Sequence, residues 1–269
     1  MKQPVLHHVS VTLALGAGVL AMSAWAGWTA GGVARPVPIQ MPFEAPPQPE
    51  TAPDTSVAPG TRPLSEEEFK RAEALLPMLD GKQELWAIGE FVHLGPGAVP
   101  VLVKALNMPS TRAKYNAIET LSMIKDPAAV PALVDTAKQP QESSRVREHA
   151  LRVAVRLDPP QVVPAIDVMA KDPNSTIRKA AAFEARYVRH KSVVPILIGL
   201  LPDPESFVAI SAIQSLWILT RHPSEMHDWE SSTKEQRVEW AQEWADWWKQ
   251  AEATFEFPPP RKPKLLPPN

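Results

Sequence analysis

Residues 99–131 read VPVLVKALNMPSTRAKYNAIETLSMIKDPAAVP, and the Val-Pro pair at each end of this segment belongs to a repeat. The prolines of four such pairs, Pro100, Pro131, Pro164 and Pro195, are separated by 31, 33 and 31 residues. A small residue follows each pair in phase, and an aliphatic residue follows seven positions later; the small residues are Ala117, Ala150, Ala181 and Ala212. This shared period is typical of stacked helical units that bury their apolar faces against one another.

Each repeat predicts a short first helix that begins near its Val-Pro pair, because proline suits the first turn of a helix. A break with Pro or Asp separates it from a longer second helix, expected at 111–125, 144–157, 175–189 and 205–221. An earlier, degenerate repeat is expected at 65–94. Its first helix runs to residue 79 and opens with Ser65 and Glu68 in capping-box spacing.

A tryptophan-rich helix is predicted at 233–251, where Trp240, Trp244 and Trp247 fall on one helical stripe. A solenoid needs its last apolar face covered, and this helix suits that role. Trp229 and Trp248 lie off the stripe, so we expect them to be the most exposed indoles.

Several short motifs recur in the repeats: Leu94-Gly-Pro-Gly-Ala-Val-Pro100, Asp126-Pro-Ala-Ala-Val-Pro131, Val146-Arg147, Asp172 and Ile177-Arg178. They resemble the HEAT-repeat family, in particular its short bacterial phycobilisome-lyase type. The resemblance covers residues 85–221. It implies an all-α protein, an α-solenoid of HEAT-like helical hairpins with a C-terminal Trp-rich capping helix. Such a motif is specific for fold and says little about function.

Lys114, Arg147 and Arg178 share one repeat position, three residues before the small residue. The resemblance implies that this arginine pairs with the Asp of an inter-helix turn, and we expect Asp172 to pair with Arg178. Ala209 takes the position in the last repeat, where the ladder of ion pairs should therefore end. The ladder can be structural, or it can form a basic strip for an acidic partner. The candidate protein-binding residues are Lys114, Arg147, Arg152, Arg178 and Arg186.

The N-terminal residues 1–34 predict export. Residues 3–34 hold no Asp, Glu, Lys or Arg, and residues 9–21 (VSVTLALGAGVLA) are apolar. One interpretation is a signal peptide cleaved after Ala26. The other is a retained membrane anchor over residues 9–34, long enough at about 39 Å to cross a bilayer. Its candidate residues are Val9, Leu13, Leu20, Trp25 and Trp28. Either interpretation places the rest of the chain in the periplasm, free or tethered to the inner membrane.

Two proline-rich segments flank the folded body. Nine of the 31 prolines lie at 35–63 and six at 254–269. Frequent proline and low apolar content favour extended chain. The domains predicted are therefore the signal or anchor (1–34), linker (35–64), solenoid (65–227), capping helix (228–253) and basic tail (254–269). The tail is expected to pack no core, and it is either a disordered end or a docking peptide.

Composition excludes several kinds of function. The net charge of −2 argues against nucleic acid as a partner, and the absence of cysteine excludes disulfides and thiolate metal sites. No His, Asp or Glu spacing indicates a metal site or catalytic group. We therefore expect no enzyme activity and no cofactor, but an exported scaffold that binds protein partners, as an accessory subunit of an envelope complex. The alternatives are a lyase- or chaperone-like HEAT protein that handles a cofactor or chromophore, and a membrane-anchored structural subunit.

Overall fold

The computed structural model describes residues 62–224 and 227–259. The predicted signal or anchor lies outside these residues, as does the linker up to Thr61. Regular structure in the described part is helical, and the α-helices are α1 (Glu66–Leu75), α2 (Glu84–Leu94), α3 (Val99–Ala105), α4 (Thr111–Ile124), α5 (Val130–Lys138), α6 (Ser144–Leu157), α7 (Val163–Ala170), α8 (Ser175–Ala185), α9 (Val193–Gly199), α10 (Ser206–Thr220) and α11 (Lys234–Ala251). Short 3₁₀ helices cover Leu76–Leu79, Gly95–Ala98, Pro127–Ala129 and Pro159–Val162.

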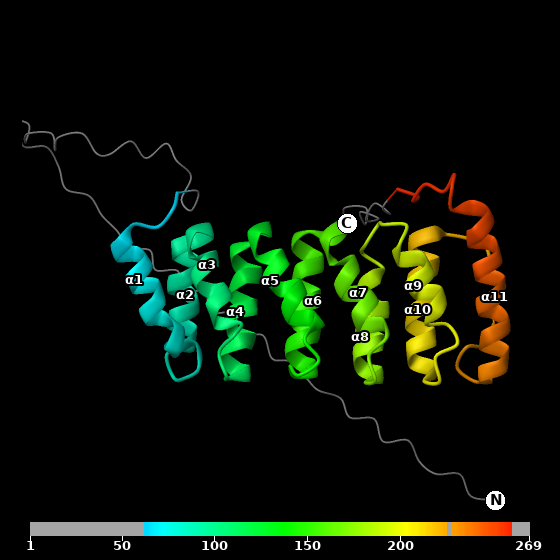
Figure 1. The fold of residues 1–269 in the computed structure, drawn as a ribbon, viewed down its shortest axis with the longest axis horizontal. Coiled ribbons are helices and arrows are strands. Elements are labelled where there is room, and N and C mark those ends of the chain that lie inside the picture. Colours follow the sequence, from blue (N-terminus) through cyan, green and yellow to red (C-terminus); the bar gives the residue numbers. More distant parts are fainter. Residues whose placement is uncertain (1–61, 225–226, 260–269) are drawn as a thin grey trace, which may run out of the picture. The chain divides into compact units, whose positions relative to one another are not determined.

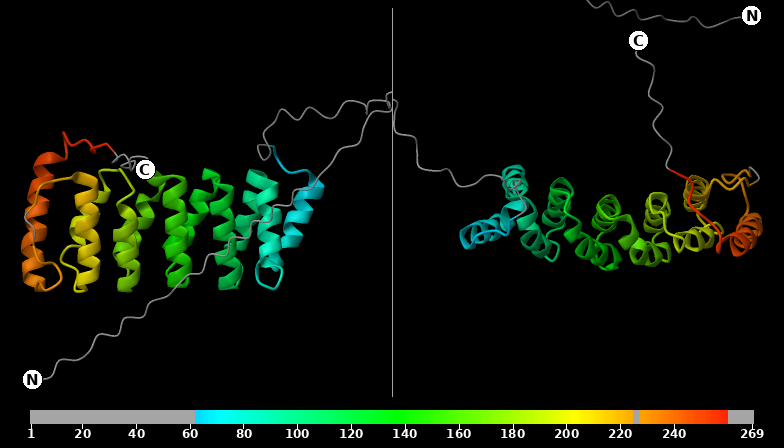
Figure 2. Two further views of the ribbon diagram at one scale, coloured as in Figure 1. Left: turned by 180° about the vertical axis from the view of Figure 1, so that it is seen from behind. Right: turned by 90° about the horizontal axis from the view of Figure 1, so that it is seen from above.

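The helices of this repeat body form two layers (Figure 1). The second helices α2, α4, α6, α8 and α10 pack in series, each against the next, and make one layer. The first helices α1, α3, α5, α7 and α9 make the other layer, and α11 packs against α9 at its end. Figure 2 shows the two layers from above. The predicted α-solenoid of helical hairpins is confirmed.

The core follows the repeat period. The small residues Ala117, Ala150, Ala181 and Ala212, with Ala87 before them, are fully buried, which lets neighbouring helices approach closely. The residue two positions after each repeat proline is also fully buried, at Leu102, Leu133, Ile166 and Leu197. Each hairpin thus contributes one small and one large apolar residue to a continuous core.

Two helices end earlier than predicted. The first helix stops at Leu75 and continues as a 3₁₀ turn to Leu79, because Pro77 has no N–H and its ring crowds the preceding turn. The second helix α8 ends at Ala185 rather than at residue 189. Of the residues that follow this early end, Arg186, Tyr187 and Arg189 line the surface described below, and Val188 is buried in the core.

The predicted capping box opens α1. The Ser65 hydroxyl accepts a hydrogen bond from the Glu68 backbone N–H, and the Glu68 carboxylate accepts one from the Ser65 N–H. Arg62 also donates to this carboxylate, at 2.8 Å from Nη1 and 2.5 Å from Nη2. The hydrogen bond from Arg62 is the main cause that lowers the pKa of Glu68 to about 2.

We predict a matching pH dependence at this helix end. Since the folded pKa of Glu68 lies below its ordinary value of 4.5, its contribution to stability is present above pH 4.5 and is lost as pH falls through about 2. A carbon-13 NMR titration of the Glu68 carboxyl should give a pKa near 2 in the native protein, and a higher pKa in Arg62→Ala. A native Glu68 that titrates near 4.5 contradicts the prediction.

One described segment, Glu84–Ala105, is long and apolar enough to cross a membrane by length and composition alone. It is not one straight helix, because Gly95 with φ 67° separates α2 from α3. Phe91 and Leu102 on its two halves are fully buried in the repeat core. We therefore assign this segment to the solenoid.

The tryptophan-rich helix α11 covers the end of the stack. Thr233 caps it and forms a capping box with Gln236. Trp244 is 2 % exposed, and its ring lies against His222 with the centroids 5.2 Å apart. The expectation for two other indoles was wrong, because Trp229 and Trp248 are both only 5 % exposed. Trp240 packs on Trp229, and Phe255 packs on Trp248.

The start of the C-terminal tail packs against the body, contrary to the expectation for residues 254–269. Phe255 and Phe257 are half-buried, and Phe255 contacts the rings of Trp247 and Trp248 at centroid distances of 5.9 and 5.3 Å. Lys191 Nζ donates to the Glu252 carbonyl at 2.5 Å. The proline content of residues 254–269 favours extended chain, whereas Phe255 and Phe257 supply the apolar contacts that dock the segment.

Candidate functional site

Three of the five candidate contact residues form buried ion pairs between successive repeats. Lys114 pairs with Glu142, Arg147 Nη2 lies 2.7 Å from Asp172 Oδ2, and Arg178 Nε lies 2.6 Å from Asp203 Oδ2. Each cation is on a second helix and each acid is in the inter-helix turn of the next repeat. At most 14 % of any of these six side chains is exposed. The ladder therefore joins successive repeats, and Lys114, Arg147 and Arg178 expose little of their side chains to a protein partner.

The predicted pairing within the ladder was shifted by one repeat. The Asp172 carboxylate pairs with Arg147. Arg178 donates to the Asp172 backbone carbonyl at 2.9 Å and forms a bidentate contact with the Asp203 carboxylate. The pKa of Arg178 is raised, chiefly by this hydrogen bond to Asp203. The ladder thus reaches the last repeat through its acid, although Ala209 replaces the cation there.

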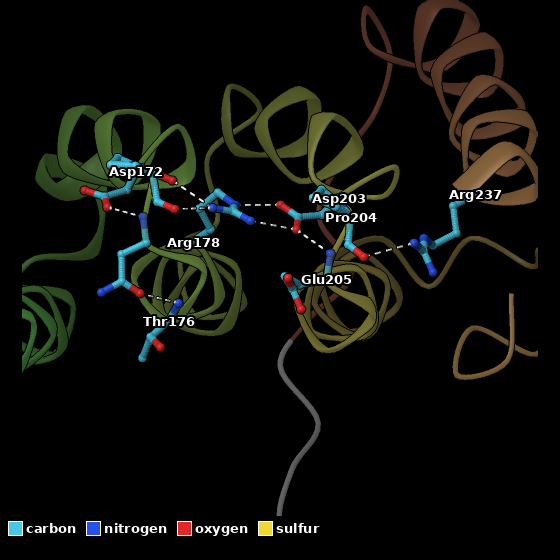
Figure 3. A network of polar contacts seen from close by, with 9 residues as sticks. Asp172, Thr176, Arg178, Asp203, Pro204, Glu205 and Arg237 are labelled. Carbon is cyan, nitrogen blue, oxygen red and sulfur yellow. Dashed lines mark hydrogen bonds and ion pairs between the residues drawn. The ribbon is translucent and has the colours of Figure 1, made fainter. Parts of the chain in front are cut away.

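Asp172 and Asp203 of the ladder also accept a hydrogen bond from the backbone N–H of the N-cap residue of the helix that follows (Figure 3). Asp172 Oδ1 accepts from the Asn174 N–H at 2.8 Å, and Asp203 Oδ1 accepts from the Glu205 N–H at 3.0 Å. Arg237 of α11 donates to the Pro204 carbonyl at 3.3 Å and joins the capping helix to the same row of turns. One carboxylate therefore binds both the cation of the preceding repeat and the backbone of the turn that leads into the next helix.

The other two candidates, Arg152 and Arg186, lie on a hollowed surface of the second-helix layer. A cavity of about 540 Å³ between α6 and α8 is lined by Arg152, Val155, Arg156, Phe183, Glu184 and Tyr187. A second cavity of about 480 Å³ extends to α10 and is lined by Arg186, Tyr187, Arg189, Trp217, Ile218, Leu219, Arg221 and Pro259. Tyr187 borders both cavities. We call the surface formed by the lining residues of these two cavities the arginine–aromatic groove.

The groove repeats with the period of the fold. Arg156, Tyr187 and Ile218 are six residues beyond the buried alanines of α6, α8 and α10, and all three are exposed. Tyr187 is 56 % and Ile218 is 51 % exposed. The equivalent residue one repeat before Arg156 is Met123, 48 % exposed and without an arginine beside it in sequence. The arginine and aromatic character is thus a property of the C-terminal repeats.

Arg186 is the least satisfied polar side chain of the groove. Its guanidinium stacks 3.9 Å from the centre of the Phe183 ring. Its Nε and Nη2 are buried and have no hydrogen-bond partner among the described residues. Burial lowers the pKa of this arginine from its usual value. A buried donor without an acceptor is costly, so the site favours a ligand that supplies acceptor atoms.

The groove is strongly basic. Arg152 pairs with Glu184 at 3.4 Å, and this carboxylate is almost fully buried. The main cause that shifts the pKa of Glu184 is burial, which raises it, and the charge of Arg152 opposes this shift. Within the described residues, the remaining arginines of the groove form no ion pair with a carboxylate; they are Arg156, Arg186, Arg189 and Arg221.

Most of this surface was not predicted from the sequence. The predicted cations lie three residues before each repeat alanine, which is where the buried ladder lies. The positions five and six residues after the alanine hold Arg186 with Tyr187, and Trp217 with Ile218. Arginine beside aromatic residues at those positions was the available signal.

The histidines of the described residues are not gathered into a site. His149 stacks on Tyr115 with ring centroids 4.3 Å apart and lies 3.1 Å from Glu119. Burial lowers the pKa of His149, and the charge of Glu119 opposes this shift. No group of three or more His, Asp or Glu residues in the described part of the chain is arranged to hold a metal ion.

Comparison with known proteins gives the family of the repeats. A family model of HEAT repeats matches residues 83–150 and 139–217, which together make up half of the chain. Among solved structures, the complex of CpcE and CpcF of phycocyanin lyase from Nostoc sp. PCC7120 shares 20 % sequence identity at a TM-score of 0.45. That match covers 56 % of this chain and 99 % of the other chain. No curated protein matches the sequence.

Proposed function

Because the chain belongs to the HEAT-repeat family, we propose that it works as a binding scaffold that presents the arginine–aromatic groove to a partner protein. The observation that carries the proposal is Arg186, which holds buried, unpartnered donors over the Phe183 ring beside a cavity of about 480 Å³. Arginine, tyrosine and tryptophan dominate the energetics of protein interfaces, and Tyr187 and Trp217 flank this arginine.

The proposal includes a cellular location. The uncharged, apolar run near the N-terminus and the proline-rich segment after it support an exported protein that is held near the inner membrane or released into the periplasm. In that setting the scaffold is an accessory subunit of an envelope complex. N-terminal sequencing of the mature protein separates the two cases. A chain that starts near Gly27 is released, and a chain that keeps residues 1–34 is a membrane-anchored subunit.

A cofactor- or chromophore-handling role is the second candidate. The cavity beside Arg186 is within the usual size of small-molecule sites, about 300–1,000 Å³, and mixes aromatic walls with arginines. A stoichiometric pigment or metal that co-purifies with the protein favours this function. A protein free of both, with a recovered partner chain, favours the scaffold, which we propose to act without catalysis.

We predict that the double variant Arg186→Gln/Tyr187→Ala reduces partner recovery at least about tenfold, since interface hot spots of these types contribute about 2 kcal/mol or more each. The measurement is crosslinking of the tagged protein in its native membranes, followed by quantitative mass spectrometry. Tyr187 is 56 % exposed, so the fold should be retained, and a melting curve checks this.

Met123→Ala is the matched control, because Met123 occupies the position of Tyr187 two repeats earlier, outside the groove. It should leave partner recovery unchanged. Equal recovery of the same partner by the native protein and the double variant overturns the role of the groove.

A further inference from the structure

The end of the groove already holds a proline-containing segment of the chain itself, Phe257-Pro258-Pro259. Arg189 Nη2 donates to the Phe257 carbonyl at 2.7 Å and to the Pro258 carbonyl, and its guanidinium lies 5.5 Å from the Phe257 ring. Arg221 Nη2 donates to the Pro259 carbonyl at 2.7 Å. Pro259 then lines the cavity beside Arg186. The segment therefore passes from Arg189, after α8, to Arg221, after α10.

This contact indicates a chemistry that the groove can recognise. Proline-rich chain has few backbone N–H groups but exposes its carbonyls, and arginine has donors and no acceptor. Aromatic walls suit the apolar proline rings of a polyproline helix, as in other grooves that bind such segments. Arg186, with two buried donors unpartnered among the described residues, offers the same contact one step further along the groove.

The spacing of the repeats matches the pitch of such a strand. Neighbouring packed helices are about 8–10 Å apart, and one turn of polyproline II helix, three residues, rises about 9 Å. A strand that crosses α10, α8 and α6 can thus present every third residue to Ile218, Tyr187 and Arg156, which are equivalent in the repeat. Acidic residues at that interval would meet the unpaired arginines of successive repeats.

The charge of the groove selects its ligand. The residues after Pro259 carry Arg261, Lys262 and Lys264, which have the same sign as the groove and match it poorly. The arginines of the groove repel this basic segment and would attract an acidic one.

We propose that the arginine–aromatic groove binds an acidic, proline-rich, extended segment of a partner protein. The segment at its end indicates the mode of binding, and the unpaired arginines give the charge preference. The proposal rests on the proposed use of the groove as a binding surface and adds the chemistry of the partner.

Three twelve-residue peptides test the proposal by titration calorimetry against the full-length protein. (Pro-Pro-Glu)₄ carries both features, (Pro-Pro-Gln)₄ removes the charge, and (Gly-Gly-Glu)₄ keeps the charge but loses the polyproline preference. We expect (Pro-Pro-Glu)₄ to bind at least about tenfold more tightly than either control. Its affinity should fall at least about tenfold in Arg186→Gln/Tyr187→Ala and stay unchanged in Met123→Ala.

Equal binding of the two acidic peptides means simple attraction of any polyanion and overturns the proposal. Equal binding of the two proline peptides, or no binding of (Pro-Pro-Glu)₄, overturns it as well. If the peptides fail while the native partner is still lost from Arg186→Gln/Tyr187→Ala, the groove binds a partner of other chemistry and only this inference falls. If the peptides do not bind and the double variant still recovers the native partner, the proposed function is overturned together with this inference.

Discussion

Trp244→Ala is expected to lower the free energy of unfolding by about 3–5 kcal/mol, as large-to-small changes of buried aromatic residues do. Trp244 is 2 % exposed and lies edge-on to His222 and to Trp247, with centroids 5.2 and 5.5 Å apart. Its removal leaves a cavity between α11 and the last repeat. Urea unfolding followed by circular dichroism measures the loss.

The position of α11 at the end of the stack gives a second readout. Stability in a solenoid is a sum of units and their interfaces, so the loss should concentrate at the C-terminal end. Hydrogen exchange in α11 should accelerate far more than in α4 or α6. Trp86→Ala is the control, because Trp86 is 51 % exposed, and it should change stability by no more than about 0.5 kcal/mol. A Trp244→Ala curve that overlays the native one excludes the capping role.

Arg147→Leu is expected to cost a similar amount, about 3–5 kcal/mol, because it leaves a buried charge without its partner. The Arg147 and Asp172 side chains are 5 % and 7 % exposed, and they lie 2.7 Å apart. The substitution also removes the hydrogen bond from Arg147 Nε to the Ala137 carbonyl at 3.0 Å. Urea unfolding at neutral pH measures the effect.

The double variant Arg147→Leu/Asp172→Asn separates charge from packing. It removes both charges, and the amide introduced by Asp172→Asn keeps an oxygen that can accept from the Asn174 N–H as Asp172 Oδ1 does. We expect it to recover a large part of the loss, since removing both partners is less costly than stranding one. Lys171→Leu is a nearby control, because Lys171 forms an exposed ion pair with Asp167 and should matter little. A double variant less stable than Arg147→Leu contradicts this account of the ladder.

The repeat body could be predicted because its signals are local and periodic. The buried alanines, the Val-Pro pairs and the capping box of Ser65 each depend on a few neighbouring residues, and all agree on one architecture. The helix bounds followed to within a few residues, except where Pro77 and the residues after Ala185 ended a helix early.

The site could not be predicted in the same way, because it depends on contacts between repeats. Arg147, Arg152 and Arg178 look alike in the sequence, yet Arg147 and Arg178 are used in the ladder and Arg152 faces the groove. Which acid each arginine meets depends on how far one hairpin is displaced from the next. The burial of Trp248 could not be predicted for a similar reason: Phe255 covers it only because the chain turns back after α11.

The sequence by itself determined the period, the helical hairpins and the need for a capping helix, because helix formation and amphipathic stripes are set by residues three and four apart. The tertiary structure decided which cations are buried, which aromatic residues are covered, and that Arg186, Tyr187 and Trp217 meet in one groove beside the docked Pro259. The ion pairs of the ladder, for example, join residues 25 to 28 positions apart, close to one repeat. They form only when stacking fixes the distance and angle between repeats, which no local pattern encodes.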